Sequence, residues 1–470
     1  MGASSCVSSF RIHGQWGRLG DLRENVKILS GIEVDHGVFA PTNGVNGHNG
    51  RPVANPEPKN QVDKWTRAGW LFIFLFVVTG MFSISVAQIS ISLAGVCWIG
   101  RWQAAGLGDW RNAPSFSPLA VPLLLFVALS LIAAVFSMDM SESLMDSKDL
   151  SHLLVFLVVF DFARRDVSKI PSLLRAVVAA GAGISLVGVY QAVQRGVSTA
   201  DRISGFNDIY MTFAGLLMLA FVAGLAVVAF DTKKWKDAWL IPALALIACA
   251  VLLSLTRNAW IGLSAGAFVV LALRKPLLVV ILPVLMVGAL MVSPGGVKDR
   301  FASIFNPNDA ANRERLYVWT AGLKLVVDRP LLGVGQNSFP KAYPKYRDPN
   351  VLEPHISHLH NNMLQIAVER GIPCLLAWLA IWGIAYYHMG MAFRAGAFRA
   401  EAPRAPGATL GLVAGLGGIT AFLVAGMFEY NFGDAEPQML VLLLLALGMA
   451  GAQQESLIPD KGKTLPASSA

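Results

Sequence analysis

The chain has 470 residues, of which 54% are hydrophobic and only 14% are charged, and its formal net charge is +8. Soluble domains carry about 25% charged residues, so this composition excludes an ordinary soluble domain and indicates an integral membrane protein. The basic balance does not require a nucleic acid partner, because basic cytoplasmic loops give a membrane protein the same bias. The four scattered cysteines show no CxxC spacing, which argues against a disulfide framework or a zinc ribbon.

The N-terminal leader, residues 1–63, is polar and rich in Gly, Asn and Ser, and it lacks the apolar stretch of a signal peptide. We expect this leader to be disordered and cytoplasmic. A polytopic membrane domain over 64–453 and a disordered cytoplasmic tail over 454–470 are expected to follow it.

Twelve apolar segments come after the leader, and a spanning helix needs roughly 20 mostly apolar residues. The first two are separated only by FSISVA, and the seventh and eighth meet at SLTRNAWIGL, so both joints leave open the alternative of one longer helix. We predict an all-α integral membrane protein with about twelve transmembrane helices. The segments lie near 69–83, 86–101, 117–137, 150–163, 170–192, 209–230, 238–256, 257–273, 276–294, 371–390, 407–428 and 436–453.

The charges of the connecting loops alternate along the chain. With the N-terminus in the cytoplasm, the inner loops are basic and the outer loops 137–149 and 428–438 are acidic, as the positive-inside rule requires. The large outer loop 295–359, between the ninth and tenth spans, breaks the pattern with nine Lys or Arg against six Asp or Glu. Long loops translocate regardless of charge, so the excess of cations makes anion binding a candidate function. Apolar residues at helical spacing over 314–327 predict a short helix within this loop.

Four arginines are predicted on the outer face. Arginine at an apolar boundary is costly unless it is paired, and its planar fork suits phosphate oxygens. We therefore predict that these side chains grip a pyrophosphate whose lipid tail stays in the bilayer, with snorkelling or a salt bridge as the alternative for each. Arg257 has the strongest case, because its hairpin is too short and apolar to need a charge. The four are Arg202, Arg257, Arg313 and Arg315.

Three histidines, His355, His358 and His360, lie within six positions at the end of the same loop. Each has the alternative of a structural role, and the HxxHxH spacing also permits a zinc site completed by Glu353 or Glu369. The third interpretation is a general base, because neutral imidazole accepts a proton near neutral pH. The following residues, NNMLQIAVERGIP, predict a helix along the interface with a bend at 371–373.

The last outer loop contains Asp434 and Glu436 in GDAEPQ. A pair of this kind could ligate a divalent cation. The alternative is a solvated acidic loop that obeys the topology rule.

Together these motifs resemble the O-antigen ligase and polymerase superfamily of membrane glycosyltransferases. The motifs that carry the resemblance are DRISGFNDIYMTFAGLL, SLTRNAW, RLYVWTAGLKLVVDRPLLGVGQNSF and HLHNNMLQIAVERGIPCLLAW. The resemblance extends from about 200 to 390 and is compatible with 65–453. It implies a GT-C-like fold in the bacterial inner membrane with the active site facing the periplasm, while the loop charges predict that both termini are cytoplasmic.

The resemblance also implies an activity: transfer of a glycan from undecaprenyl pyrophosphate to a hydroxyl acceptor, with inversion and without a cofactor or metal ion. The family's arginines would fall on Arg257 and Arg315, with Arg202 and Arg313 as further candidates, and its histidine on His360 or, second, His358. Asn361 and Glu369 would be supporting residues. Expected partners are the lipid-linked donor, membrane lipids and an acceptor, for which lipid A–core is favoured.

Other activities remain open at this point. An O-antigen or exopolysaccharide polymerase and a protein O-oligosaccharyltransferase share the same motifs. The alternative of another class is a transporter of polysaccharide or lipid-linked glycan. Transporters generally place polar residues mid-membrane and often contain internal repeats, and neither feature is evident here.

Overall fold

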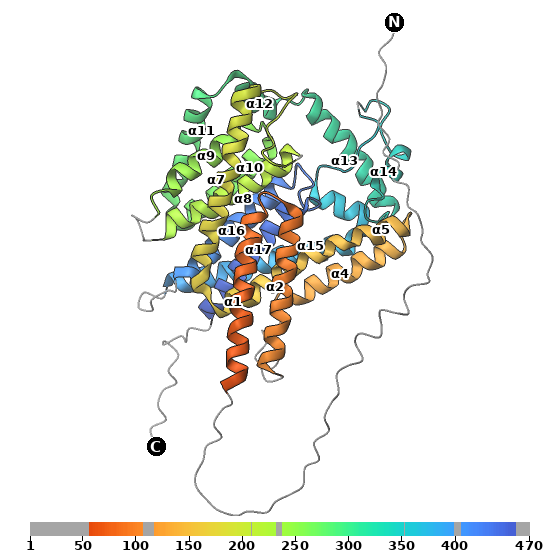
Figure 1. Ribbon diagram of the computed structural model, residues 1–470. Helices are drawn as coiled ribbons and strands as arrows, with labels where there is room; N and C mark the ends of the chain where they lie inside the picture. Colours follow the sequence, from red (N-terminus) through yellow and green to blue (C-terminus); the bar gives the residue numbers. More distant parts are fainter. Residues whose placement is uncertain are drawn as a thin grey trace, which may run out of the picture. The chain divides into compact units, whose positions relative to one another are not determined.

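A computed structural model describes residues 56–106, 117–207, 209–231, 237–351, 353–398 and 406–456, and every regular element in these residues is a helix (Figure 1). The α-helices are α1 (Pro56–Thr79), α2 (Ile84–Ala105), α4 (Ala120–Val135), α5 (Met140–Asp146), α6 (Leu154–Arg165), α7 (Ile170–Arg195), α8 (Tyr210–Phe230), α9 (Leu240–Leu253), α10 (Arg257–Arg274), α11 (Ile281–Val292), α12 (Gly295–Ala302), α13 (Ala310–Asp328), α14 (Phe339–Ala342), α15 (Asn362–Phe398), α16 (Pro406–Ala425) and α17 (Ala435–Ser456). Short 3-10 turns lie at Ser147–Leu153, Val167–Lys169, Pro276–Val280, Ser303–Phe305 and Tyr343–Lys345.

The all-helical class predicted from hydropathy is confirmed over the described residues, and each of the twelve predicted segments overlaps a helix. Within these residues, six helices are long and apolar enough to cross a membrane: Ile84–Ala105, Val167–Arg195, Tyr210–Phe230, Asn362–Gly396, Gly407–Ala425 and Ala435–Gln454. Three further apolar helices are shorter, at Ala120–Val135, Leu240–Leu253 and Pro276–Val292. The number of twelve spans therefore stays a prediction.

Both joints that the sequence left open are breaks between helices. Helix α1 ends at Thr79, where a turn closed by the N–H of Ser83 on the Thr79 carbonyl oxygen (2.8 Å) sends the chain back along α1 as α2. Helices α9 and α10 are separated by three residues, of which Leu255 has a left-handed backbone (φ 54°). Helix α1 begins at Pro56, before the expected start of the membrane domain at residue 64, and residues 1–55 and 457–470 lie outside the described part.

The most buried helices are α16 and α17, and α8 packs against both of them. Helix α10 is drawn close to α16 because its inward positions are glycines. A Cβ atom on Gly262 would lie 2.6 Å from the Ala421 carbonyl oxygen, and one on Gly266 would lie 2.8 Å from that of Gly417. Small residues permit such backbone contact between apolar helices. This packing fixes α10, and with it the position of Arg257 at its first turn.

The residues between α11 and α15 form a second, smaller hydrophobic cluster that packs on the first turns of α15. It is built from Val318, Ala321, Leu325, Val334, Phe339, Ala342, Tyr343, Leu359 and Val368. The segment is thus a folded unit and not an extended loop. Helix α13 occupies the place where the sequence predicts a helix over 314–327.

The predicted bend after the histidines is present, because α15 is broken at Gly371 (φ 83°). Segment 330–335 closes this break: the N–H groups of Val334 and Gly335 donate to the carbonyl oxygens of Val368 and Glu369, both at 2.9 Å. These carbonyls end a helical stretch and would otherwise lack partners. A side chain on Gly371 would collide with the backbone of Leu331, so both the positive φ and the close approach require glycine here.

Candidate active site

A pocket of about 350 Å³ lies between the start of α8, the start of α10, helices α12 and α13, and segment 353–360. Three of the four arginines predicted from the sequence line it, namely Arg202, Arg257 and Arg315, and so does His360. Arg300, a fourth lining arginine, was not predicted. Residues from segments more than 150 positions apart are therefore gathered around one cavity.

Arg257 is the first residue of α10 and its side chain is 7% exposed. Its Nη1 donates to the backbone oxygen and the hydroxyl of Ser303 and to Asp309, each at 3.1 Å. Nη2 of the same guanidinium is buried and has no partner among the described residues. One arm of the fork is thus held by the turn before α13, while the other is free for an anion.

The neighbouring arginines show the same incomplete pairing. The Nε atoms of Arg202 and Arg315 are buried without a hydrogen-bond partner in the described part of the chain. Arg202 is steadied by the ring of Tyr210, 4.3 Å from its guanidinium carbon. An unpaired buried donor is costly unless a ligand supplies the acceptor, so these atoms are available to an anion in the pocket.

The charges of these cations act on one another. Burial lowers the pKa of Arg300 to about 10, and the charges of Arg257, Arg202 and Arg315 add to the effect. Burial also lowers the pKa of Arg315; the carboxylate of Glu429 opposes this, and Arg257 adds to it. These neighbouring guanidinium groups repel one another, and an anion bound between them would relieve the repulsion.

His360 is paired with a glutamate that comes from the other side of the fold. Its Nδ1 lies 3.1 and 3.2 Å from the two carboxylate oxygens of Glu429, which is buried. The backbone of His360 is left-handed (φ 49°), an uncommon conformation for a residue other than glycine. His358 packs edge-on against His360, with ring centroids 4.3 Å apart, and burial lowers its pKa against the opposing charge of Glu429.

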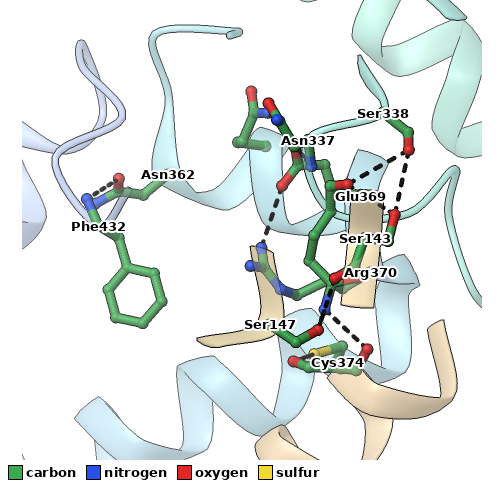
Figure 2. Close-up of polar contacts among 12 residues, drawn as sticks. Ser143, Ser147, Asn337, Ser338, Asn362, Glu369, Arg370, Cys374 and Phe432 are labelled. Carbon is green, nitrogen blue, oxygen red and sulfur yellow. Dashed lines mark hydrogen bonds and ion pairs between the residues drawn. The ribbon is translucent and has the colours of Figure 1, made fainter. Parts of the chain in front are cut away.

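Two successive asparagines hold the Glu429 loop against His360. The N–H of Asn362 donates to the Gly426 oxygen (2.7 Å), its side-chain nitrogen donates to Asn431 (2.6 Å), and its side-chain oxygen accepts from the N–H of Phe432 (3.0 Å). The last of these contacts is visible in Figure 2. Asn361 adds one bond to the Met427 oxygen at 3.0 Å. The loop is therefore pinned on both sides of Glu429.

Glu369, predicted as a supporting residue, does not line the pocket. It is buried beside Arg370 and accepts from the N–H of Asn337 (3.0 Å) and from Gln365 (2.8 Å). Figure 2 shows it with Asn337 and Ser338 on one side and Arg370 on the other. Glu369 thus joins α15 to segment 336–338 and braces the helix that begins two residues after His360.

Of the other candidate residues, Glu353 and His355 line the pocket, whereas Arg313, His358, Asp434 and Glu436 do not. Arg313 is exposed on α13, and His358 lies behind His360. Asp434 bonds to Thr212 (3.3 Å), and burial together with the charges of Glu429 and Glu436 raises its pKa to about 7. A carboxyl that is half protonated at neutral pH is a poor cation ligand.

A different group has metal-ligand spacing. His358, His360 and Glu429 each offer one ligand atom, and these atoms lie within 4.8 Å of one another. The zinc alternative left open by the sequence would therefore be completed by Glu429, and not by Glu353 or Glu369. The distance from His360 to Glu429 is that of an ordinary charge-assisted hydrogen bond.

Two residues of this site were missed by sequence reasoning. Arg300 was one cation among many in a basic segment. Glu429 stands 69 residues after His360, in a loop whose acidity already satisfied the topology rule. The cluster of histidines at 355–360 is the one sequence signal for a carboxylate partner, and it does not say which carboxylate.

The long apolar helices indicate a multi-pass membrane protein. Residues 242–379, which carry Arg257, Arg315 and His360, are similar to the family model described as O-antigen ligase. A candidate polysaccharide ligase of Rickettsia bellii is 26% identical over 278 residues, 55% of this chain and 65% of that protein. One of Rickettsia conorii is 24% identical over 189 residues, 37% of this chain and 44% of that protein. The matched regions span less than two thirds of either relative.

Proposed function

We propose that the protein is a glycosyltransferase that moves an oligo- or polysaccharide from undecaprenyl pyrophosphate to a hydroxyl acceptor at the periplasmic face of the inner membrane. The observation that carries the proposal is the single pocket in which partly unpaired arginines meet His360. The O-antigen ligase domain and the polysaccharide ligase names of the relatives support the same activity. Lipid A–core is the favoured acceptor.

The arginines act on the leaving group. As the bond between the anomeric carbon and the phosphate oxygen breaks, negative charge grows on the departing pyrophosphate. The free Nη2 of Arg257 and the free Nε atoms of Arg202 and Arg315 donate to its oxygens. Preorganised donors of this kind are worth about 3–4 kcal/mol each in the transition state.

His360 acts on the nucleophile. Its Nδ1–H donates to Glu429, which leaves Nε2 free to accept the proton of the attacking hydroxyl. The new bond joins the hydroxyl oxygen to the anomeric carbon on the face opposite the pyrophosphate, so the configuration inverts. The buried carboxylate of Glu429 stabilises the imidazolium that results. No ATP is consumed, because the donor is already activated.

The test is a transfer assay in proteoliposomes, with the lipid-linked donor and the acceptor on one face. Arg257→Lys is expected to abolish most transfer, because an ammonium cannot fork two oxygens. Arg313→Lys is the matched control, since Arg313 is exposed outside the pocket. Wild-type turnover by Arg257→Lys would contradict the proposal.

Variations of this assay, and one observation in cells, distinguish the proposed glycosyltransferase from the alternative functions. Product that forms without movement of donor across the bilayer distinguishes an enzyme from a transporter. Activity that survives a chelator distinguishes the base from a zinc ion on His358, His360 and Glu429. The acceptor is read from the surface glycans of a deletion strain: core without any polymer indicates a ligase, single repeats on core a polymerase, and unglycosylated protein a protein transferase.

A further inference from the structure

Helix α13 has one face that lines the pocket and another that exposes apolar side chains. Ala311, Glu314, Arg315 and Val318 line the pocket. On another side, three large apolar residues are left uncovered: Leu316 is 58% exposed, Leu323 59% and Val327 78%. They are spaced seven and four residues apart, so they form one stripe along the helix.

The apolar stripe, defined here as Leu316, Leu323 and Val327, continues toward a candidate membrane-spanning helix. Leu331, 69% exposed, follows α13 directly. The next contact is with α15, where the N–H of Ile372 donates to the Pro330 oxygen at 2.8 Å. Beyond it, Leu376 on α15 is 59% exposed. The uncovered apolar surface of α13 therefore adjoins the apolar surface of a helix that is long enough to cross the bilayer.

Cations flank the stripe, while the acids of α13 are engaged elsewhere. Arg313 precedes Leu316 by three residues and Lys324 precedes Val327 by three, so each is a surface neighbour of the stripe. Both are exposed and have no ion-pair partner in the part of the chain that is described. Glu314 lines the pocket, and Asp328 accepts from the hydroxyl of Tyr346 (2.6 Å).

We propose that α13 lies in the lipid–water interface, with the apolar stripe among the acyl chains and Arg313 and Lys324 on anionic phosphates of the headgroups. An apolar face bordered by cations is the pattern of helices that bind a membrane surface. A stable protein partner would bury about 800 Å² on each side, which a single line of three side chains does not provide. The apolar stripe is therefore covered by lipid and not by a second copy of the chain.

The depth of α13 in the interface would also position the lipid-linked donor, a point that rests on the proposed function. Arg315 sits on the same helix as the stripe. If the stripe is immersed, Arg315 is held at headgroup level, so that a lipid-anchored diphosphate reaches the pocket without leaving the bilayer.

The direct test is photo-crosslinking of the full chain in vesicles of phosphatidylcholine and alkyne-tagged phosphatidylglycerol. The photoreactive residue p-benzoylphenylalanine replaces Leu323 or, as the control, Asn350, which is exposed in the segment after α14. We expect a lipid adduct at position 323 several times stronger than at position 350. Equal labelling at the two positions, no adduct at either, or a crosslinked dimer at position 323 would overturn the inference.

A functional test uses a double variant, Leu323→Glu with Val327→Glu, and Asn350→Glu as the control. Transfer is measured from the undecaprenyl-linked donor in vesicles and from the same glycan on a short-chain, water-soluble diphosphate. We expect a severalfold loss with the long-chain donor only. Equal loss with both donors, or no loss with the long one, contradicts the consequence. If the unmodified chain uses neither donor, the proposed function fails, while the crosslinking result still decides where α13 lies.

Discussion

Arg175 and Arg257 both lie in the first two turns of a helix and are partly or fully buried, but their guanidinium groups are paired differently. Arg175 on α7 lies between two carboxylates, with Asp231 at 2.5 Å and Asp237 at 2.6 Å, and so ties the ends of α8 and α9 together. Arg257 has one carboxylate, Asp309 at 3.1 Å, and a buried Nη2 without a partner. An arginine whose guanidinium is paired with protein carboxylates stabilises the fold. One that keeps an unpaired donor beside other cations is instead a candidate for binding an anion.

We expect the largest loss of transfer activity when His360, the proposed general base, is replaced. His360→Ala should lower the rate of transfer by about 10²–10⁴, the usual contribution of a positioned proton acceptor. His355→Ala is the control, because His355 also lines the pocket, whereas the hydrogen bond to Glu429 comes from His360. The measurement is kcat for both variants in proteoliposomes. Comparable losses in the two would mean that His360 has no special role.

The same conservative change, arginine to lysine, tests whether Arg257 and Arg175 have different roles. Arg257→Lys should lower kcat about 10²–10³-fold and leave the melting temperature nearly unchanged. Arg175→Lys should do the opposite, because it weakens a bidentate staple far from the pocket. Initial rates and thermal unfolding of both variants decide the matter. A large rate loss in Arg175→Lys would remove the distinction.

A moderate effect is expected at Glu429. Burial raises the pKa of this carboxyl, but the hydrogen bond from His360 and the charges of His360 and His358 outweigh burial and hold the pKa below its usual range. The pairing therefore stabilises the fold above the ordinary glutamate pKa of about 4.3, and this contribution is lost as the pH falls through the lowered value. Glu429→Gln should lower kcat about tenfold or more with little change in KM, since it removes the partner that stabilises imidazolium.

Asp434 should give a smaller effect, and it should make stability depend on pH in the direction opposite to Glu429. Its pKa is raised to about 7, so the folded state holds a proton that the unfolded state releases near pH 4. Stability should consequently fall as the pH rises from about 4 to 7. Asp434→Asn should remove this loss and stabilise the protein at pH 8 by up to about 4 kcal/mol, since each pKa unit corresponds to 1.36 kcal/mol. Thermal unfolding of both proteins from pH 4 to 8 is the measurement, and parallel curves would contradict it.

The sequence predicted the helices well and the site in part. Apolar segments reveal helices because a bilayer demands them, and Arg257, Arg315 and His360 stand out because charge or histidine at an apolar boundary is locally unusual. The number of spans is harder to predict, because α9 and α4 are short and no local signal says whether they cross.

The missed residues depend on contacts between distant segments. Arg300 reaches the pocket only through the fold of α12, and Glu429 reaches His360 only because Asn361 and Asn362 pin its loop. Hydropathy carries no information on such pairings. The bend at Gly371 could be predicted, whereas its closure by segment 330–335 could not, because backbone hydrogen bonds leave no side-chain pattern.

Helix α10 starts at Arg257, and Thr256 supplies no side-chain cap to its first turn. The amide dipoles of a helix sum to roughly half a positive charge at this end, and its first N–H groups lack partners within the helix. Thr256 and Asn258 both line the pocket, so the backbone itself contributes a positive potential that no side-chain substitution can delete. Inorganic diphosphate should accordingly retain some affinity for the pocket even after Arg257 is replaced by alanine.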